Sequence, residues 1–117
     1  MKLVYVSGPY SYYEVPGEDR WQYCGVLYNI NIARQHAIKI WNRGDAAICP
    51  HLNTACFEYD CDATYDQYIA GDLLMVDRCD VIYMLPNWEH SKGAIMEHQL
   101  AVDIGKEIEY AEGATKP

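Results

Sequence analysis

The sequence has no long apolar run and few basic residues. Its longest uninterrupted apolar stretches are a handful of residues, far short of the roughly 20 that a membrane-spanning helix needs. Nine Lys and Arg stand against 17 Asp and Glu, a net charge of −8, and the basic residues do not cluster. Proteins that bind long nucleic acid need a basic footprint. We therefore expect no nucleic acid and no membrane as partners, whereas a small phosphorylated ligand needs only local donors.

The sequence also lacks the common phosphate-binding motifs and a signal peptide. The segment "GPYSYY" is neither a G-x-G-x-x-G fingerprint nor a P-loop, so no dinucleotide or triphosphate cradle is predicted. The start, "MKLVYVSGPYS", has no apolar segment followed by a small-residue cleavage site, and it predicts a first strand. We expect a cytoplasmic protein.

Cysteine is present in an odd number, which favours reduced thiols over a disulfide framework. Cys49, His51, Cys56 and Cys61 lie within 13 residues, but their spacings differ from the usual zinc pairs. We expect loop or apolar packing roles for this cluster, and neither a metal nor a cofactor.

Short strand-like runs alternate with helical patterns along the chain. The expected strands are 3–7, 46–49, 80–85 and 107–110, and the expected helices are 28–43, 65–78 and about 93–105, with a loop over 50–64. This alternation predicts an α/β fold: a single doubly wound domain over residues 1–110, with a four-to-five-stranded parallel sheet in a flavodoxin/Rossmann-like three-layer sandwich. Residues 111–117 are expected to be a flexible tail.

Two acids fall on helix faces that should be apolar. On the helical wheel Glu97 lies within an arc of Ala94, Met96, Leu100, Ala101 and Ile104, and Asp72 lies within an arc of Tyr65, Tyr68, Ile69, Met75 and Val76. A buried carboxylate costs stability unless it is paired or hydrogen-bonded. Each acid alone is readily explained as hydrogen-bonded structure, but two beside the ligand edge of a parallel sheet favour function. Paired carboxylates suit chemistry at a sugar C1′, where positive charge develops.

The loop after the first strand adds candidate ligand contacts. Gly8 follows the strand directly, where a missing side chain lets a ligand approach the backbone. Several aromatic residues follow, of which Tyr10 is a candidate for stacking on a base. For most of these aromatics, packing against the core or a subunit is the favoured interpretation.

Three segments resemble the nucleoside 2-deoxyribosyltransferase-like superfamily, in particular its small bacterial and phage branch, and are similar to the 2′-deoxynucleoside 5′-monophosphate N-glycosidases. They are "VYVSGPYS", "NIARQHAIKIWNRGD" and "GDLLMVDRCDVIYMLPNWEHSKGAIMEHQLAVDIGKEI", with the spacing Ser91–x–Gly93–x–x–x–Glu97. The resemblance covers most of the chain apart from residues 50–64.

The resemblance implies a retaining mechanism in which Glu97 attacks the anomeric carbon and Asp72 assists departure of the base or orients the sugar. It also implies that Tyr5 holds the nucleophile and that Ser7, Gly8 and Gly93 contact the substrate. Asp80 matches a family position too, and a structural cap at the head of its strand explains it equally well.

Position 91 separates the branches of the superfamily. The transferases carry an acid there, whereas the monophosphate hydrolases carry a serine that binds the 5′-phosphate, as Ser91 would. The hydrolases also place an arginine in the first loop at the position of Ser11, and Arg20 lies later in that loop as a possible replacement. Trp88 either closes over the base or packs its own loop.

The expected function is therefore hydrolysis of the N-glycosidic bond of a nucleoside or its 5′-monophosphate. A base-exchanging transferase, a non-catalytic nucleotide-binding module and a purely structural domain are the alternatives. Ile95, Val102 and Leu74 project away from the apolar arcs, which predicts a homodimer or higher homo-oligomer.

Overall fold

The computed structural model describes residues 1–11 and 25–117, and the named contacts below refer to these residues. The elements are β1 (Leu3–Ser7), α1 (Val26–Asn42), β2 (Ala46–Ile48), α2 (Pro50–Asn53), η1 (Phe57–Tyr59), α3 (Tyr65–Arg78), β3 (Val81–Met84), η2 (Trp88–His90), α4 (Lys92–Asp103) and β4 (Glu107–Tyr110). The predicted strands and long helices are all present, with ends shifted by at most two residues.

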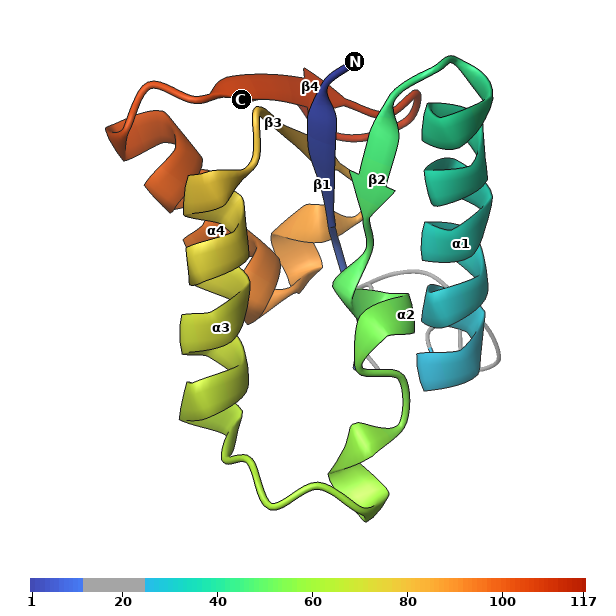
Figure 1. Ribbon diagram of the computed structural model, residues 1–117, viewed down its shortest axis with the longest axis vertical. Helices are drawn as coiled ribbons and strands as arrows, with labels where there is room; N and C mark the ends of the chain where they lie inside the picture. Colours follow the sequence, from blue (N-terminus) through green and yellow to red (C-terminus); the bar gives the residue numbers. More distant parts are fainter. Residues whose placement is uncertain (12–24) are drawn as a thin grey trace, which may run out of the picture.

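The four strands form one parallel sheet in the order β2-β1-β3-β4. In Figure 1 the sheet lies between α1 on one side and α3 with α4 on the other, which confirms the predicted three-layer α/β fold. The chain leaves β1 in one direction to reach β2 and returns to place β3 on the other side of β1. The carboxyl ends of β1 and β3 therefore form the switch point at which such sheets bind ligands.

Alternation along β1 divides its side chains between the two faces of the sheet. Val4 and Val6 pack in the cluster that contains the buried residues of α1, whereas Tyr5 packs in the cluster that contains those of α3 and α4. Because residues two apart in a strand share a face, Ser7 points to the same side as Tyr5. This side is the one that carries the candidate acids.

The helix ends follow from local sequence. After α1, Gly44 has φ of +96° and the amides of Gly44 and Asp45 donate to the carbonyls of Trp41 and Ile40, the hydrogen bonds of a Schellman motif. At the start of α3 the Thr64 hydroxyl accepts from the Gln67 amide. These caps fix where each helix meets the sheet.

The connection from β2 to α3 departs from the expectation of a plain loop, because it contains α2 and η1. Pro50 occupies the first turn of α2, where its fixed φ suits a helix and its missing N–H is not needed. The four-residue helix is too short to produce an apolar period, so the sequence pattern did not reveal it.

Within the last seven residues, expected to be a flexible tail, Ala111 and Ala114 pack against the core, whereas the other five are exposed. The Ala111 amide donates to the Met84 carbonyl and extends the β3–β4 pairing, and Ala111 is buried. Trp88 Nε1 donates to the Thr115 carbonyl at 2.9 Å. The tail is therefore tied to both β3 and η2.

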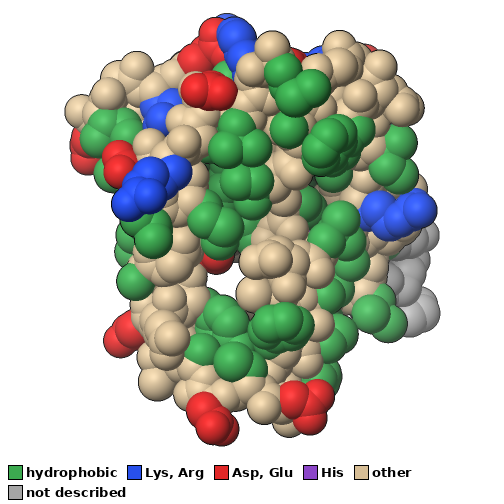
Figure 2. Space-filling model, viewed as in Figure 1, with side chains coloured by type: hydrophobic (Ala, Val, Ile, Leu, Met, Phe, Trp, Pro, Cys, Tyr) green, Lys and Arg blue, Asp and Glu red, His purple; other side chains and the backbone are tan. Residues whose placement is uncertain are grey.

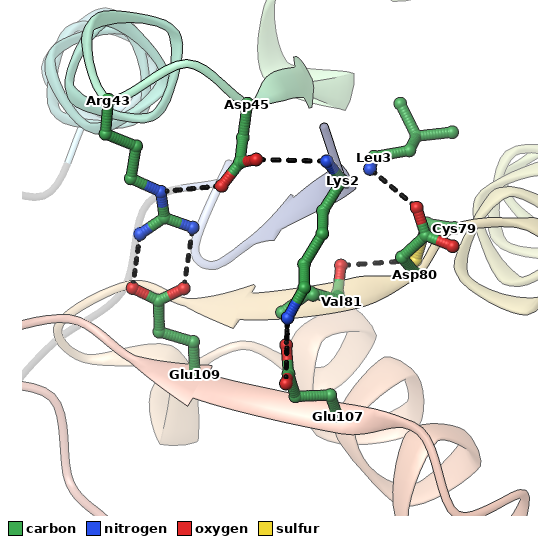
Figure 3. Close-up of polar contacts among 9 residues, drawn as sticks. All are labelled: Lys2, Leu3, Arg43, Asp45, Cys79, Asp80, Val81, Glu107 and Glu109. Atoms are coloured by element: carbon green, nitrogen blue, oxygen red, sulfur yellow. Dashed lines mark hydrogen bonds and ion pairs between the residues drawn. The ribbon is translucent and has the colours of Figure 1, made fainter.

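An ionic network joins the elements at the amino end of the sheet (Figure 3). Arg43 bonds both oxygens of Glu109 at 2.6 and 2.8 Å and also Asp45, while Lys2 pairs with Glu107. Asp80, which the resemblance left open as a site residue or a cap, accepts from the Leu3 amide at 2.8 Å, so here it acts as a structural acceptor. No helix within residues 1–11 and 25–117 has the length and hydropathy to cross a bilayer.

Candidate active site

A cavity of about 530 Å³ opens beyond the carboxyl ends of the strands. Figure 2 shows this face hollowed between α3 and the connection that follows β2, with acidic atoms at the edge of the hollow. The candidate residues that line the cavity are Tyr5, Gly8, Tyr10, Asp72, Ser91, Gly93 and Glu97. Residues that lie up to 92 positions apart in the chain are thus brought to one cavity.

Glu97 is buried and held by two hydroxyl groups of β1. It is only 7% exposed; Tyr5 donates its phenol proton to Oε2 at 3.0 Å, and Ser7 donates to Oε1 at 2.6 Å. Tyr5 and Ser7 can both reach it because they lie two residues apart on the strand face that α4 covers. Each carboxylate oxygen therefore has a fixed donor, which answers how an acid is accommodated on the inner side of this helix.

The two cavity acids have raised pKa values. The pKa of Glu97 is raised to about 7, because burial and the charge of Asp72 together outweigh the lowering effect of the Ser7 and Tyr5 hydrogen bonds. Burial likewise raises the pKa of Asp72 to about 6. The two groups interact, so the protons leave the pair in shared steps rather than from one residue at a time. Near pH 6.5 the pair holds about one proton, and the reactive form is the one in which Glu97 is ionised and Asp72 carries that proton.

This raised pKa predicts a pH-dependent stabilisation by Glu97→Gln. An acid whose pKa is higher in the folded state binds more protons when folded, so the wild-type protein loses stability as the pH rises from about 4.5 to about 7. Glutamine carries no such charge. In urea unfolding, the free energy of unfolding of Glu97→Gln should therefore rise relative to that of the wild type by a few kcal/mol between pH 4.5 and pH 8. Asp103→Asn, an exposed change on α4, should show no such trend, and a parallel pH response of Glu97→Gln and wild type would contradict the burial argument.

Gly8 and Gly93 line the cavity, and close packing also favours glycine at both positions. A Cβ at Gly8 would lie 2.7 Å from the Leu85 side chain, so β1 and the residue after β3 approach too closely for alanine. A Cβ at Gly93 would lie 3.3 Å from Ile69 Cδ1 and would tighten the contact between α3 and α4. Gly8 is thus required by packing as well as by its position on the cavity.

Ser91 is the N-cap of α4, and its hydroxyl accepts from the Ala94 amide at 3.1 Å. The Lys92 and Gly93 amides of the same first turn have no acceptor within the helix. Ser91, Lys92 and Gly93 all line the cavity. The positive end of the α4 dipole therefore faces the cavity.

Three other candidates occupy different surroundings. Tyr10 lines the cavity and its hydroxyl donates to Glu58. Trp88 is buried and stacks on His98 with ring centroids 4.4 Å apart. It does not line the cavity, so its position favours packing of its own loop over closure on the base. Arg20 lies outside the described residues.

His51, which the sequence offers only as a possible metal ligand, lines the cavity. It is 5% exposed, and its Nε2 lies 2.8 Å from the Pro9 carbonyl, while burial lowers its pKa. The rule that places strand carboxyl ends at one edge, applied to the residues that follow β2, would have indicated it. Within the described part of the chain no three His, Cys, Asp or Glu residues are arranged to hold a metal ion.

Comparison with known proteins adds a family and a fold. The family model described as Domain of unknown function (DUF4406) matches residues 26–110. Among solved structures the chain is similar to a 2-desoxiribosyltransferase from Leishmania mexicana, with a TM-score of 0.56 and 16% sequence identity. That similarity covers 94% of this chain but 63% of the other, and at this identity it shows the fold alone. No curated protein matches the sequence.

Proposed function

The chain belongs to the family described as Domain of unknown function (DUF4406), and we propose that it hydrolyses the N-glycosidic bond of a deoxynucleoside or its 5′-monophosphate. The observation that carries this proposal is the buried Glu97, whose two oxygens are each fixed by a hydroxyl, beside Asp72 in one cavity. The fold that the chain shares with a deoxyribosyltransferase agrees with it.

In the first step the Glu97 carboxylate attacks C1′ and the bond from C1′ to the base nitrogen breaks. The electron pair leaves with the base, which takes a proton from Asp72. In the second step water attacks C1′, Asp72 accepts its proton and the ester bond to Glu97 breaks. The products are the free base and a sugar with a 1′-hydroxyl, and both carboxyl groups return to their starting states.

Tyr5 and Ser7 keep the Glu97 carboxylate oriented toward the sugar and favour its ionised form. For a monophosphate, the amides of Lys92 and Gly93, which have no acceptor within the helix, are suited to the 5′-phosphate. Lys92 adds a positive charge at the same end of the cavity. The groups that contact the substrate phosphate and the reacting carbon would then lie on successive turns of α4.

A panel of deoxynucleosides and their monophosphates tests the proposal. Free base, measured by chromatography, should appear, and intact-mass analysis after rapid quenching should show a sugar adduct on the protein. Adding a second free base separates hydrolysis from transfer, because a transferase would form the exchanged nucleoside. Tight binding of intact nucleotide with no product after long incubation would contradict catalysis and favour a binding module.

We also propose that the chain acts as a homodimer or higher oligomer in the cytoplasm. Ile95, Val102 and Leu74 are about half exposed, as expected for a contact face over α3 and α4. The cysteines that the structure describes are free thiols. Sedimentation velocity at micromolar concentration should give a dimer or larger species, and Ile95→Lys should shift it toward monomer. A monomeric wild-type protein would refute this association.

A further inference from the structure

The wall of the cavity farthest from the sheet carries an acid that the mechanism above does not use. Glu58 lies on η1, in the connection between β2 and α3, and it lines the same cavity as Glu97 and Asp72. Figure 1 shows this connection closing the lower side of the molecule, away from the strands. The resemblance to the nucleoside 2-deoxyribosyltransferase-like superfamily leaves out residues 50–64, so no role for Glu58 follows from it.

Glu58 is held in place although it is exposed. The Tyr10 hydroxyl lies 3.1 Å from both of its carboxylate oxygens, and the same hydroxyl accepts from the Cys56 amide at 3.0 Å. Tyr10 itself follows β1 and lines the cavity. A chain of hydrogen bonds thus ties η1 to the end of the first strand and fixes the direction of the carboxylate.

A fixed carboxylate with one donor retains lone pairs for further N–H groups. The sugar must lie at Glu97 in the proposed reaction, and the α4 amides stand at one end of the cavity, which leaves the side of η1 for the base. Two parallel N–H donors on one planar edge suit a carboxylate best, since both oxygens are then engaged. Guanine presents such an edge through its ring N1–H and its 2-amino group.

We propose that Glu58 selects the base, and that the preferred substrate carries guanine or another base with adjacent N–H donors. The proposal rests on the proposed function and names its substrate class. Hypoxanthine offers the ring N–H alone. Thymine offers one N–H flanked by two carbonyl oxygens, which the carboxylate repels. Adenine and cytosine, each with one amino group at this edge, should fall between guanine and thymine.

The pair deoxyguanosine and deoxyinosine 5′-monophosphate isolates the 2-amino group. The wild type should favour the guanine nucleotide in kcat/KM by about 10- to 100-fold, the usual range for a bidentate contact to a base. Glu58→Gln should reduce this ratio to within a few-fold of one, and Tyr10→Phe should reduce it partly. Asp60→Asn removes the same charge from an exposed neighbour outside the cavity lining and should leave the ratio unchanged.

Binding separates this inference from the proposed chemistry. Calorimetric titration of the same two nucleotides into Glu97→Ala should show the guanine preference, and the added Glu58→Gln change should remove it. Preference in binding without base release would overturn the hydrolase proposal and leave the role of Glu58 standing. Base release with a ratio that Glu58→Gln does not alter, or equal binding of both nucleotides, would overturn the role of Glu58.

Discussion

Glu97→Ala is expected to lower the rate of base release by roughly four to six orders of magnitude, as loss of a covalent nucleophile does in other enzymes. Without the carboxylate no ester to C1′ forms, and the hydroxyls of Tyr5 and Ser7 lose the group that they orient. Chromatographic measurement of free base under single-turnover conditions would give the ratio directly. The sugar adduct seen by mass analysis should vanish in the same variant.

Two further variants separate chemistry from folding. Glu97→Gln keeps the volume of the side chain and should be as inactive as Glu97→Ala while unfolding at higher urea concentration than the wild type at pH 8. Asp103→Ala, on the exposed end of the same helix, should retain full activity. Base release by Glu97→Ala at the wild-type rate would remove Glu97 from the mechanism.

The fold was predictable because its signals are local. Four short apolar strands and three amphipathic helices alternate, and only a parallel sheet with helices on both faces accommodates that order. The helix ends were equally readable, because Gly44 and Thr64 are residues whose backbone or side chain fits a cap. The short α2 and η1 carry no period, so they were missed.

The orientation of α4 was predicted only in part. The wheel placed Glu97 inward, but it also placed Met96 and Ile104 inward, whereas both are more than 40% exposed. The buried face is rotated to include His98, which stacks on Trp88 and bonds the Tyr110 hydroxyl at 2.7 Å. A wheel weighs only apolar character, so it does not detect a histidine that is buried by partners from two other segments.

The alternation of side chains along a strand places both donors to Glu97 on one face of the sheet. Tyr5 and Ser7 share one face of β1 by period two, and that face is the one under α4. The resemblance implied the role of Tyr5, but nothing in the sequence assigned Ser7 to the carboxylate. Which hydroxyl reaches which acid depends on the register between strand and helix, and that register is set by packing.

Asp72→Asn is expected to slow base release by about 10²- to 10⁴-fold for an ordinary purine nucleotide at neutral pH, the usual contribution of a general acid. Asparagine keeps the shape and a hydrogen-bonding side chain but has no acidic proton for the departing base. Asp66→Asn, on the solvated side of the same helix, should have no effect.

The pH profile of kcat/KM shows which protonation state of Glu97 and of Asp72 the reaction needs. In the wild type kcat/KM requires ionised Glu97 and protonated Asp72, so it should follow a narrow bell near pH 6 to 7 whose two limbs belong to the pair. Asp72→Asn should lose the alkaline limb, because no general acid remains to titrate. Its remaining limb should report the pKa of Glu97 alone, lower than in the wild type because the neighbouring charge that raises it is gone. Ser7→Ala should raise the pKa of Glu97, because the Ser7 hydrogen bond lowers it.

A leaving group that needs no proton separates acid catalysis by Asp72 from sugar orientation. A 7-methylguanine nucleotide already carries a positive charge on the base, so its departure does not depend on Asp72. In the first turnover Asp72→Asn should therefore release this base at a rate within about 10-fold of the wild type, because Asp72 is then needed only for the later attack of water. An equal loss with both nucleotides would mean that Asp72 binds or orients the sugar. The proton for the base would then have to come from another group that lines the cavity, such as the buried His51.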